Sequence, residues 1–176
     1  GISMATSRAD MKQTLRRRLR AQREERYVEH NLLHLLDLPE FSRARVIASY
    51  YSYGTEPSTI AINRAILASG KTLILPRING DDIEWVDWNG TEETLKENGK
   101  FTEPTGPVFT KLDSIDLVLV PALAIDPDGY RLGQGGGFYD RALPQLRAHK
   151  HGVVYAYERM EHDLPREPWD IAVDSW

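Results

Sequence analysis

The 176-residue chain contains no cysteine. Disulfide bridges, thiolate nucleophiles and cysteine metal ligands are therefore excluded, and the composition fits a reducing compartment, for which we predict the cytoplasm. The sequence also lacks an apolar run of about 18 residues, the length that a membrane-spanning helix needs, so we expect no membrane partner. No secretory leader is recognisable, and residues 1–3 before Met4 resemble an expression-vector remnant, which leaves 4–176 as one predicted domain.

An overall excess of positive charge is also missing, because the formal net charge is −4. By composition the chain is not a nucleic-acid-binding protein. Positive charge gathers in residues 8–26, where eight basic and three acidic residues give a net charge of +5. Met11, Leu15 and Leu19 recur there at helical spacing, which predicts a helix with one narrow apolar stripe. The helix is either a solvated basic surface or an arm that brings cations to an anionic ligand; RNA binding is less favoured, since no aromatic residues are interleaved.

The middle of the chain has the order strand, helix, strand. Residues 45–52 are β-branched and aromatic and predict a buried strand, and residues 71–76 predict a second one. Between them lies an apolar helical pattern with Ser58 or Thr59 as a plausible N-cap and Gly70 as the stop. This order predicts a right-handed parallel βαβ unit.

The remaining segments extend this unit into a sheet. Residues 81–88 alternate and suit an edge strand, whereas 89–110 are polar and predict a loop with a short helix. Residues 116–125 are the most apolar and predict a central strand covered on both faces, and 151–157 predict another strand. We therefore predict a single-domain α/β fold, with an open, mainly parallel sheet flanked by helices and a basic N-terminal helix.

The stretch "RLGQGGGFYDR" (131–141) follows the predicted central strand and leads into a predicted helix that begins near Gly136 or Gly137. Ligands of parallel sheets bind at the carboxyl ends of strands, and glycine lets phosphate oxygens reach backbone N–H groups. We therefore predict a phosphate held by backbone amides, with Arg131 as a charge-assisted donor. The glycine spacing fits neither the P-loop nor the dinucleotide-binding fingerprint.

The segment "LVLVPALAIDPDGYRLGQGGGFYDR" resembles the signature of the 5-formyltetrahydrofolate cyclo-ligase family, also called methenyltetrahydrofolate synthetase. The basic N-terminal stretch, "YSYGTEPST", "ASGKTLILPR" and "LPREPWDIAVD" follow in the family's order, so the resemblance covers nearly the whole chain. It implies an open sheet like that of the ribose-5-phosphate isomerase/CoA transferase-like fold. It also implies ATP- and Mg²⁺-dependent cyclisation of 5-formyltetrahydrofolate to 5,10-methenyltetrahydrofolate, with ADP and phosphate released, by a protein that we expect to be a monomer.

The resemblance also implies site residues, position by position. The nucleotide is expected at Arg8, Lys12, Arg131, Gly133, Gln134, Gly135, Gly136, Gly137, Phe138 and Tyr139. Folate is expected at Tyr51, Glu56, Gln134, Gly135, Gly136, Gly137 and Phe138. Arg131 and Tyr139 are the expected catalytic residues, and Asp140 and Asp170 are the expected magnesium ligands, since Mg²⁺ needs only one or two carboxylates.

Plainer interpretations of several residues stay open. Asp170 is either a magnesium ligand or a turn cap, and Glu56 is either a folate contact or a helix N-terminal charge. Trp85 and Trp88 are either pocket or packing residues. His30 and His34 have helical spacing but lack the glutamate of a zinc-protease motif. Two other classes also stay open: a sugar-phosphate isomerase or acyl-transfer enzyme, for which we find no acid–base pair, and a non-catalytic nucleotide- or RNA-binding module, whose binding would fall steeply with salt.

Overall fold

The computed structural model describes residues 7–176, so the predicted remnant at 1–3 lies outside the described part. The helical elements are α-helices and short 3₁₀ turns. They are α1 (Arg8–Arg26), η1 (Leu33–Asp37), α2 (Pro39–Arg43), α3 (Ile60–Ala68), η2 (Glu92–Thr94), η3 (Leu112–Ser114), α4 (Phe138–Ala142), η4 (Leu143–Gln145) and η5 (Ala156–Glu158). Across residues 7–176, none of these helices combines the length and apolar character of a membrane span.

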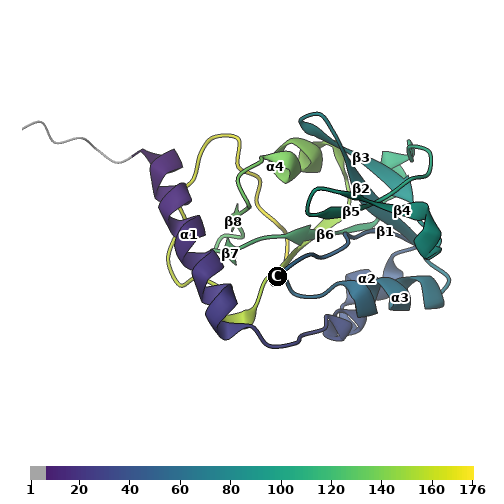
Figure 1. Cartoon of the computed structure of the whole chain (residues 1–176), viewed down its shortest axis with the longest axis horizontal. Helices are drawn as coiled ribbons and strands as arrows, with labels where there is room; N and C mark the ends of the chain where they lie inside the picture. The colour runs from purple at the N-terminus through teal and green to yellow at the C-terminus, as the bar shows by residue number, and fades with distance from the viewer. Residues whose placement is uncertain (1–6) are drawn as a thin grey trace, which may run out of the picture.

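A five-stranded sheet with the order β3-β2-β1-β6-β9 forms the centre of the molecule (Figure 1). Its strands are β1 (Val46–Ala48), β2 (Thr72–Asn79), β3 (Asp82–Asp87), β6 (Leu117–Pro121) and β9 (His149–Val153). All neighbouring pairs are parallel except β2 and β3, which form an antiparallel hairpin at one edge. The predicted parallel βαβ unit and the edge strand are therefore confirmed.

Each face of the sheet is covered by its own helices (Figure 1). Ile47, Leu73 and Leu117 point to the face that packs against η1, α2 and α3. Their neighbours along the strands, such as Ile74 and Val118, point to the opposite face and pack against α4 and η4. The alternation of strand side chains thus builds two apolar layers, which is the reason the central strands read as continuous apolar runs.

The end of α3 follows the predicted glycine stop. Gly70 has φ +76°, its N–H donates to the Leu67 carbonyl, and the Lys71 N–H donates to the Ile66 carbonyl. This pair of hydrogen bonds is a Schellman motif, and the left-handed backbone explains why glycine occupies the position. At the other end Thr59 is the N-cap residue, but its side chain makes no capping bond.

The apolar segment 116–125 is not one strand, so that prediction is wrong in its second half. β6 ends at Pro121, and the carbonyls of Pro121 and Ala122 accept hydrogen bonds from Arg131 and Arg23 at 3.0 and 2.6 Å. These side-chain bonds replace the strand ladder. The chain then forms β7 (Ala124–Ile125), which pairs with β8 (Arg131–Leu132), and β1 rather than β6 is the middle strand of the sheet.

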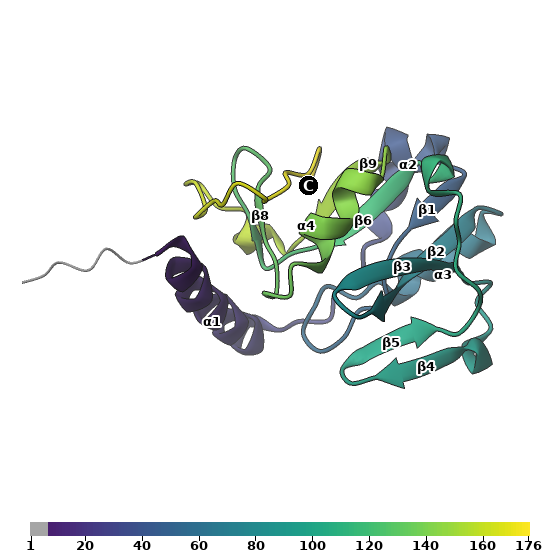
Figure 2. The same ribbon diagram turned by 90° about the horizontal axis from the view of Figure 1, so that it is seen from above.

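The predicted loop 89–110 contains a β-hairpin that the sequence analysis missed. β4 (Leu95–Asn98) pairs with β5 (Phe101–Pro104), and Gly99 at the turn has φ +60°. The Asn98-Gly99 dipeptide is a strong hairpin signal, but the alternation of the flanking residues is too polar to stand out. The hairpin is a separate two-stranded sheet that lies beside the five-stranded one, near β2 and β3 (Figure 2).

The helix predicted after the glycine stretch is also shorter than expected. α4 has five residues and passes into the 3₁₀ turn η4, whose second residue is Pro144. Proline removes a backbone donor and clashes with the preceding turn, so a regular α-helix does not continue there. The last strand begins at His149, two residues before the predicted start at 151.

The basic stretch 8–26 is a single helix, as predicted. It lies at the side of the molecule, away from the sheet (Figures 1 and 2). Leu19 is buried and packs with Leu132 and Leu164, whereas Met11 is 39% exposed. Leu15 also packs against this cluster, so the predicted stripe faces inward except at Met11, and the inward face carries Lys12 and Arg23 as buried residues too.

Candidate active site

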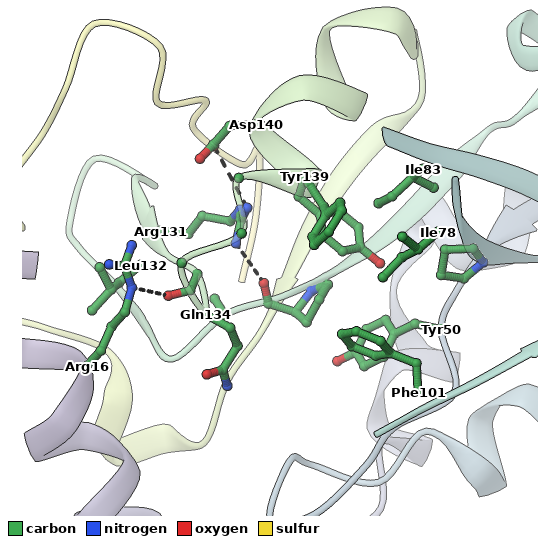
Figure 3. Close-up of a pocket in the computed structure, with 18 of the residues that line it drawn as sticks. Arg16, Tyr50, Ile78, Ile83, Phe101, Arg131, Leu132, Gln134, Tyr139 and Asp140 are labelled. Atoms are coloured by element: carbon green, nitrogen blue, oxygen red, sulfur yellow. Dashed lines mark hydrogen bonds and ion pairs between the residues drawn. The ribbon is translucent and has the colours of Figure 1, made fainter. Parts of the chain in front are cut away.

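A cavity of about 410 Å³ opens where β1 and β6 end. Tyr50 and Tyr51 follow β1, Pro121 closes β6, and the glycine stretch after β8 forms the facing wall. The cavity therefore lies at the carboxyl edge of the parallel strands, where the sequence predicted a ligand. The lining divides into a basic half with Arg16 and Arg131 and an apolar half with aromatic and aliphatic side chains (Figure 3).

The glycine loop 133–137 needs glycine for two separate reasons. Gly135 and Gly137 have φ +110° and +71°, which side-chain-bearing residues rarely adopt. Gly136 has an ordinary φ, but a Cβ atom there would lie 2.6 Å from the Phe138 ring. All five residues of the loop line the cavity. The backbone is thus exposed to the cavity, as the phosphate-loop prediction requires.

Three arginines hold the carbonyl oxygens of this loop. Arg16 Nε donates to the Gly133 carbonyl at 2.8 Å, and Arg20 donates to the carbonyl and side-chain oxygens of Gln134, both at 2.8 Å. From the other side, Arg141 donates to the Gly136 carbonyl at 2.8 Å. The carbonyls are therefore occupied by guanidinium groups. The backbone N–H groups of 135–137 donate to no backbone carbonyl within residues 7–176. These donors are therefore available to an anion.

Arg131 is a buried cation with too few partners. One of its terminal nitrogens donates to the Pro121 carbonyl at 3.0 Å, the other lies 3.8 Å from Asp140 Oδ1, and its side chain is 4% exposed. Its Nε is buried without a hydrogen-bond partner. Burial lowers the pKa of the guanidinium, while the nearby Asp140 carboxylate raises it. An orphaned buried donor on a cation costs about 1–3 kcal/mol, and a bound anion would remove that cost.

Lys12 joins the N-terminal helix to the C-terminal segment at the same half of the cavity. Its ammonium lies 2.7 and 2.9 Å from the two carboxylate oxygens of Asp170 and 2.9 Å from Glu167 Oε1. Asp170 also accepts the Glu167 N–H at 2.9 Å, so it caps a turn as well. Asp170 thus caps a turn, as one interpretation predicted, and it also lines the cavity, while its role as a magnesium ligand stays a prediction.

Asp140 completes this cluster from the first turn of α4. Its Oδ1 accepts the backbone N–H of Ile171 at 3.3 Å, so Asp140 and Asp170 lie next to each other at the cavity wall. No group of three or more His, Cys, Asp or Glu side chains suited to a metal ion occurs in the described range 7–176. This wall of the cavity thus places Asp140 beside Asp170, without a closed metal site among residues 7–176.

The opposite half of the cavity is apolar and aromatic. Tyr50, Ile78, Ile83 and Phe101 surround it, and Tyr139 lies between this half and Arg131 (Figure 3). Burial raises the pKa of the Tyr50 hydroxyl well above its ordinary value, and that hydroxyl is buried without a hydrogen-bond partner. Such a region suits a flat heteroaromatic ligand that brings polar groups of its own.

Glu56 lies in the wall of this apolar half. Burial raises the pKa of its carboxyl to about 7, although the Tyr53 N–H, which donates to Oε1 at 2.9 Å, acts in the opposite direction. The loop that carries it is fixed, since Thr59 Oγ1 donates to the Tyr50 carbonyl at 2.6 Å and Tyr155 OH donates to the Thr55 carbonyl at 2.7 Å. Glu56 is thus a preorganised acceptor for donors on a ligand.

The structure brings all but one of the predicted site residues to this cavity. The exception is Arg8, which is exposed at the start of α1 and does not line the cavity. Trp85 and Trp88 also stay out of the lining: they pack edge-on against Tyr139 and Tyr51, behind the wall. His30 and His34 do not line the cavity, and their rings stack on each other with centroids 6.1 Å apart.

Sequence reasoning missed several lining residues. They include Arg16, Tyr50, Ile78, Ile83, Phe101, Glu103, Glu167 and Trp169. For Arg16 a signal was present, because it lies four residues after Lys12 and shares its helical face. For the strand residues there was none, since they resemble ordinary core positions until the hairpins are placed.

Sequence comparison agrees with this geometry. Residues 3–175 match the 5-formyltetrahydrofolate cyclo-ligase family. The chain belongs to this family. Relatives named 5-formyltetrahydrofolate cyclo-ligase include one from Mycolicibacterium smegmatis, 32% identical over 73% of this chain and 71% of that protein, and one from Escherichia coli, 28% identical over 91% and 92%.

Solved structures of the family share the fold. The NMR structure of Aquifex aeolicus 5,10-methenyltetrahydrofolate synthetase superposes with a TM-score of 0.77 at 32% identity, covering 93% of this chain and 87% of that one. A synthetase of the same name from Mycoplasma pneumoniae gives a TM-score of 0.72 at 22% identity, covering 93% and 96%, and this likeness concerns the fold alone. The protein is therefore an enzyme of the cyclo-ligase family with the family's α/β architecture.

Proposed function

We propose that the enzyme converts 5-formyltetrahydrofolate to 5,10-methenyltetrahydrofolate with MgATP as the co-substrate. In this proposal the triphosphate lies in the basic half of the cavity, against the glycine loop, Lys12, Arg16 and Arg131. The pterin lies in the apolar half, where Glu56 accepts hydrogen bonds from its amino and ring N–H groups. The two halves meet at Tyr139, so the formyl oxygen and the γ-phosphoryl group come together there.

The observation that carries the proposal is the incomplete pairing of Arg131. A guanidinium that is 4% exposed, with one unpartnered nitrogen and its nearest carboxylate at 3.8 Å, is arranged for an anion that the free protein lacks. Phosphate oxygens provide acceptors that a guanidinium binds through short charge-assisted bonds. In this proposal the loop N–H groups of 135–137, which donate to no backbone carbonyl among residues 7–176, bind the same anion.

The donor set also fits a magnesium ion. Asp140 and Asp170 are hard oxygen ligands at one wall, and Mg²⁺ bound with nucleotide needs only one or two carboxylates beside phosphate oxygens and waters. When bound, the ion would neutralise charge on the transferring phosphoryl group. Lys12 holds Asp170 in the free protein, so it would balance the carboxylates until the nucleotide and its metal arrive.

The chain's own groups then act by positioning and charge. The formyl oxygen attacks the γ-phosphorus and ADP leaves; N10 attacks the activated formyl carbon, loses its proton, and phosphate leaves. Arg131 and Lys12 stabilise the negative charge that develops on the phosphoryl oxygens, and the apolar wall excludes water from the activated formyl group. No protein nucleophile is needed, which fits a chain without cysteine.

The direct test is to incubate the protein with 5-formyltetrahydrofolate and MgATP and to follow the absorbance of the methenyl product together with ADP release. Product formation that requires both ATP and magnesium supports the proposal. Product without ATP, or ATP hydrolysis without product, would contradict it. A monomeric enzyme in the cytoplasm stays our prediction from the sequence.

A further inference from the structure

Trp169 is the most exposed of the four tryptophans, although it is the largest type of apolar side chain. It is 61% exposed, whereas Trp85 and Trp88 are 3% and 7% exposed and Trp176 packs against the second core cluster. In the described chain, 7–176, no aromatic ring and no cation stacks on its indole. Packing within the protein does not explain this residue.

The position of Trp169 is nevertheless fixed at the cavity. Its neighbours Glu167 and Asp170 both bind the Lys12 ammonium, and the turn is closed by the Asp170 N–H, which donates to the Glu167 carbonyl at 3.0 Å. Trp169 itself lines the cavity. Because Trp169 lines the cavity and is also 61% exposed, it lies at the rim, next to the Lys12 ion pairs of its neighbours.

The facing side of the rim belongs to α1. Ala9 lines the cavity and lies one helical turn before Lys12, on the same face. Its methyl group occupies little space next to the ion pair. The rim therefore offers a large flat surface on one side and a small side chain on the other.

The two halves of the cavity decide what this rim can bind. The apolar half takes the pterin, and the glycine loop with Lys12, Arg16 and Arg131 takes the triphosphate. The nucleoside end of the nucleotide must then extend outward, past Lys12. We infer that Trp169 stacks on the purine base of the bound nucleotide, an inference that rests on the proposed function. A ring face alone does not read the base edge, so stacking should serve ATP and GTP alike.

The test compares ligands with and without a base. Isothermal titration gives the Kd values of MgATP, MgGTP and magnesium tripolyphosphate for the wild type, Trp169→Ala, Trp169→Phe and Tyr27→Ala. Tyr27 is a matched control, because it is an exposed aromatic, 52% exposed, outside the cavity lining. We expect Trp169→Ala to raise the Kd of both nucleotides roughly 5- to 100-fold. Tripolyphosphate binding should be unchanged, Trp169→Phe should retain most of the affinity, and Tyr27→Ala should match the wild type.

Each other outcome has a definite meaning. Equal losses for MgATP and tripolyphosphate in Trp169→Ala would overturn the stacking inference, because the residue would then act on the phosphate site. Unchanged nucleotide affinity would overturn it as well, with the proposed function intact. A wild type that binds neither MgATP nor tripolyphosphate would remove the proposed function and the inference together.

Discussion

The Lys12 ammonium lies 2.7 Å from a carboxylate oxygen of Asp170, a residue 158 positions later in the chain. This ion pair, extended by Glu167 at 2.9 Å, fastens helix α1 to the segment that precedes the last residues of the protein. Without it, the basic half of the cavity would lack one wall. One wall of the candidate site therefore depends on a direct contact between α1 and the C-terminal segment, both outside the central sheet.

We expect Lys12→Met to destabilise the protein, because it leaves two carboxylates without their cation in a buried setting. Removing one partner of a buried ion pair costs about 3 kcal/mol in free energy of unfolding. Urea denaturation measures the change, with Arg17→Met, an exposed position on the same helix, as the control. A loss no larger than that of the control would show that the pair adds nothing to stability.

A second prediction separates two arginines of α1. Arg16 contacts the glycine loop and lines the cavity, whereas Arg8 does neither. We expect Arg16→Ala to raise the Kd of MgATP roughly 10- to 100-fold, the size of one lost charge-assisted interaction. Arg8→Ala should change it less than about twofold. Titration calorimetry on both variants decides the matter, and a larger effect at Arg8 would restore the assignment made from the sequence.

The third prediction concerns pH. Burial raises the pKa of Glu56 to about 7, and only the ionised carboxylate can accept from both the amino and ring N–H groups of a pterin. The affinity for 5-formyltetrahydrofolate should therefore increase as the pH rises from 6 to about 8. Glu56→Gln should bind more weakly and with a flat pH profile. A wild-type profile that is equally flat would contradict the role of Glu56.

The same carboxyl links stability to pH in the ligand-free protein. Its folded pKa lies above its ordinary value of 4.5, so the folded state holds the proton more tightly. The resulting stabilisation is complete below pH 4.5 and is lost as the pH rises through about 7, by at most about 3 kcal/mol. The difference in unfolding free energy between wild type and Glu56→Gln, measured from pH 4 to about 8, should follow this course.

The fourth prediction tests Asp140 as a magnesium ligand. Asp140→Asn should lower turnover sharply and raise the magnesium concentration that gives half-maximal rate, while folate affinity is kept. If Asp140 serves only as a counter-charge to Arg131, 3.8 Å away, the variant would instead lose stability with an unchanged magnesium requirement. Magnesium titrations of the rate, run beside thermal melts, distinguish the two results.

Much of the fold was predictable because local patterns coincided with tertiary structure. The βαβ unit was marked by apolar runs, helical spacing and Gly70, and each signal acts within a few residues. The prediction of one strand over 116–125 was wrong because the signal there is not local. The apolar residues do not reveal that Arg131 binds the Pro121 carbonyl and Arg23 the Ala122 carbonyl. Arg23 comes from a distant part of the chain, and Arg131 reaches back only after the β7–β8 turn has formed.

The residues of the candidate site were likewise predictable only where the sequence signal is local. The glycine loop was predictable, since consecutive glycines before an aromatic pair have few structural explanations. The apolar wall was not, because Ile78 and Phe101 take part only after two hairpins are placed beside each other. The charged face of α1 was found only in part, since a stripe of leucines suggests an apolar contact and does not show that Lys12 lies buried next to it.

The Lys12–Asp170 pair also sets an order in time. During synthesis α1 emerges first, and the Lys12 ammonium waits for its carboxylate partners Glu167 and Asp170, the latter 158 residues further along the chain. At ordinary elongation rates this interval is roughly 8 to 30 s. The sheet can form while the helix waits with its basic face exposed, so the nascent chain can fold without being able to bind nucleotide. The ability to bind nucleotide would then arise only after the segment around Asp170 has been added.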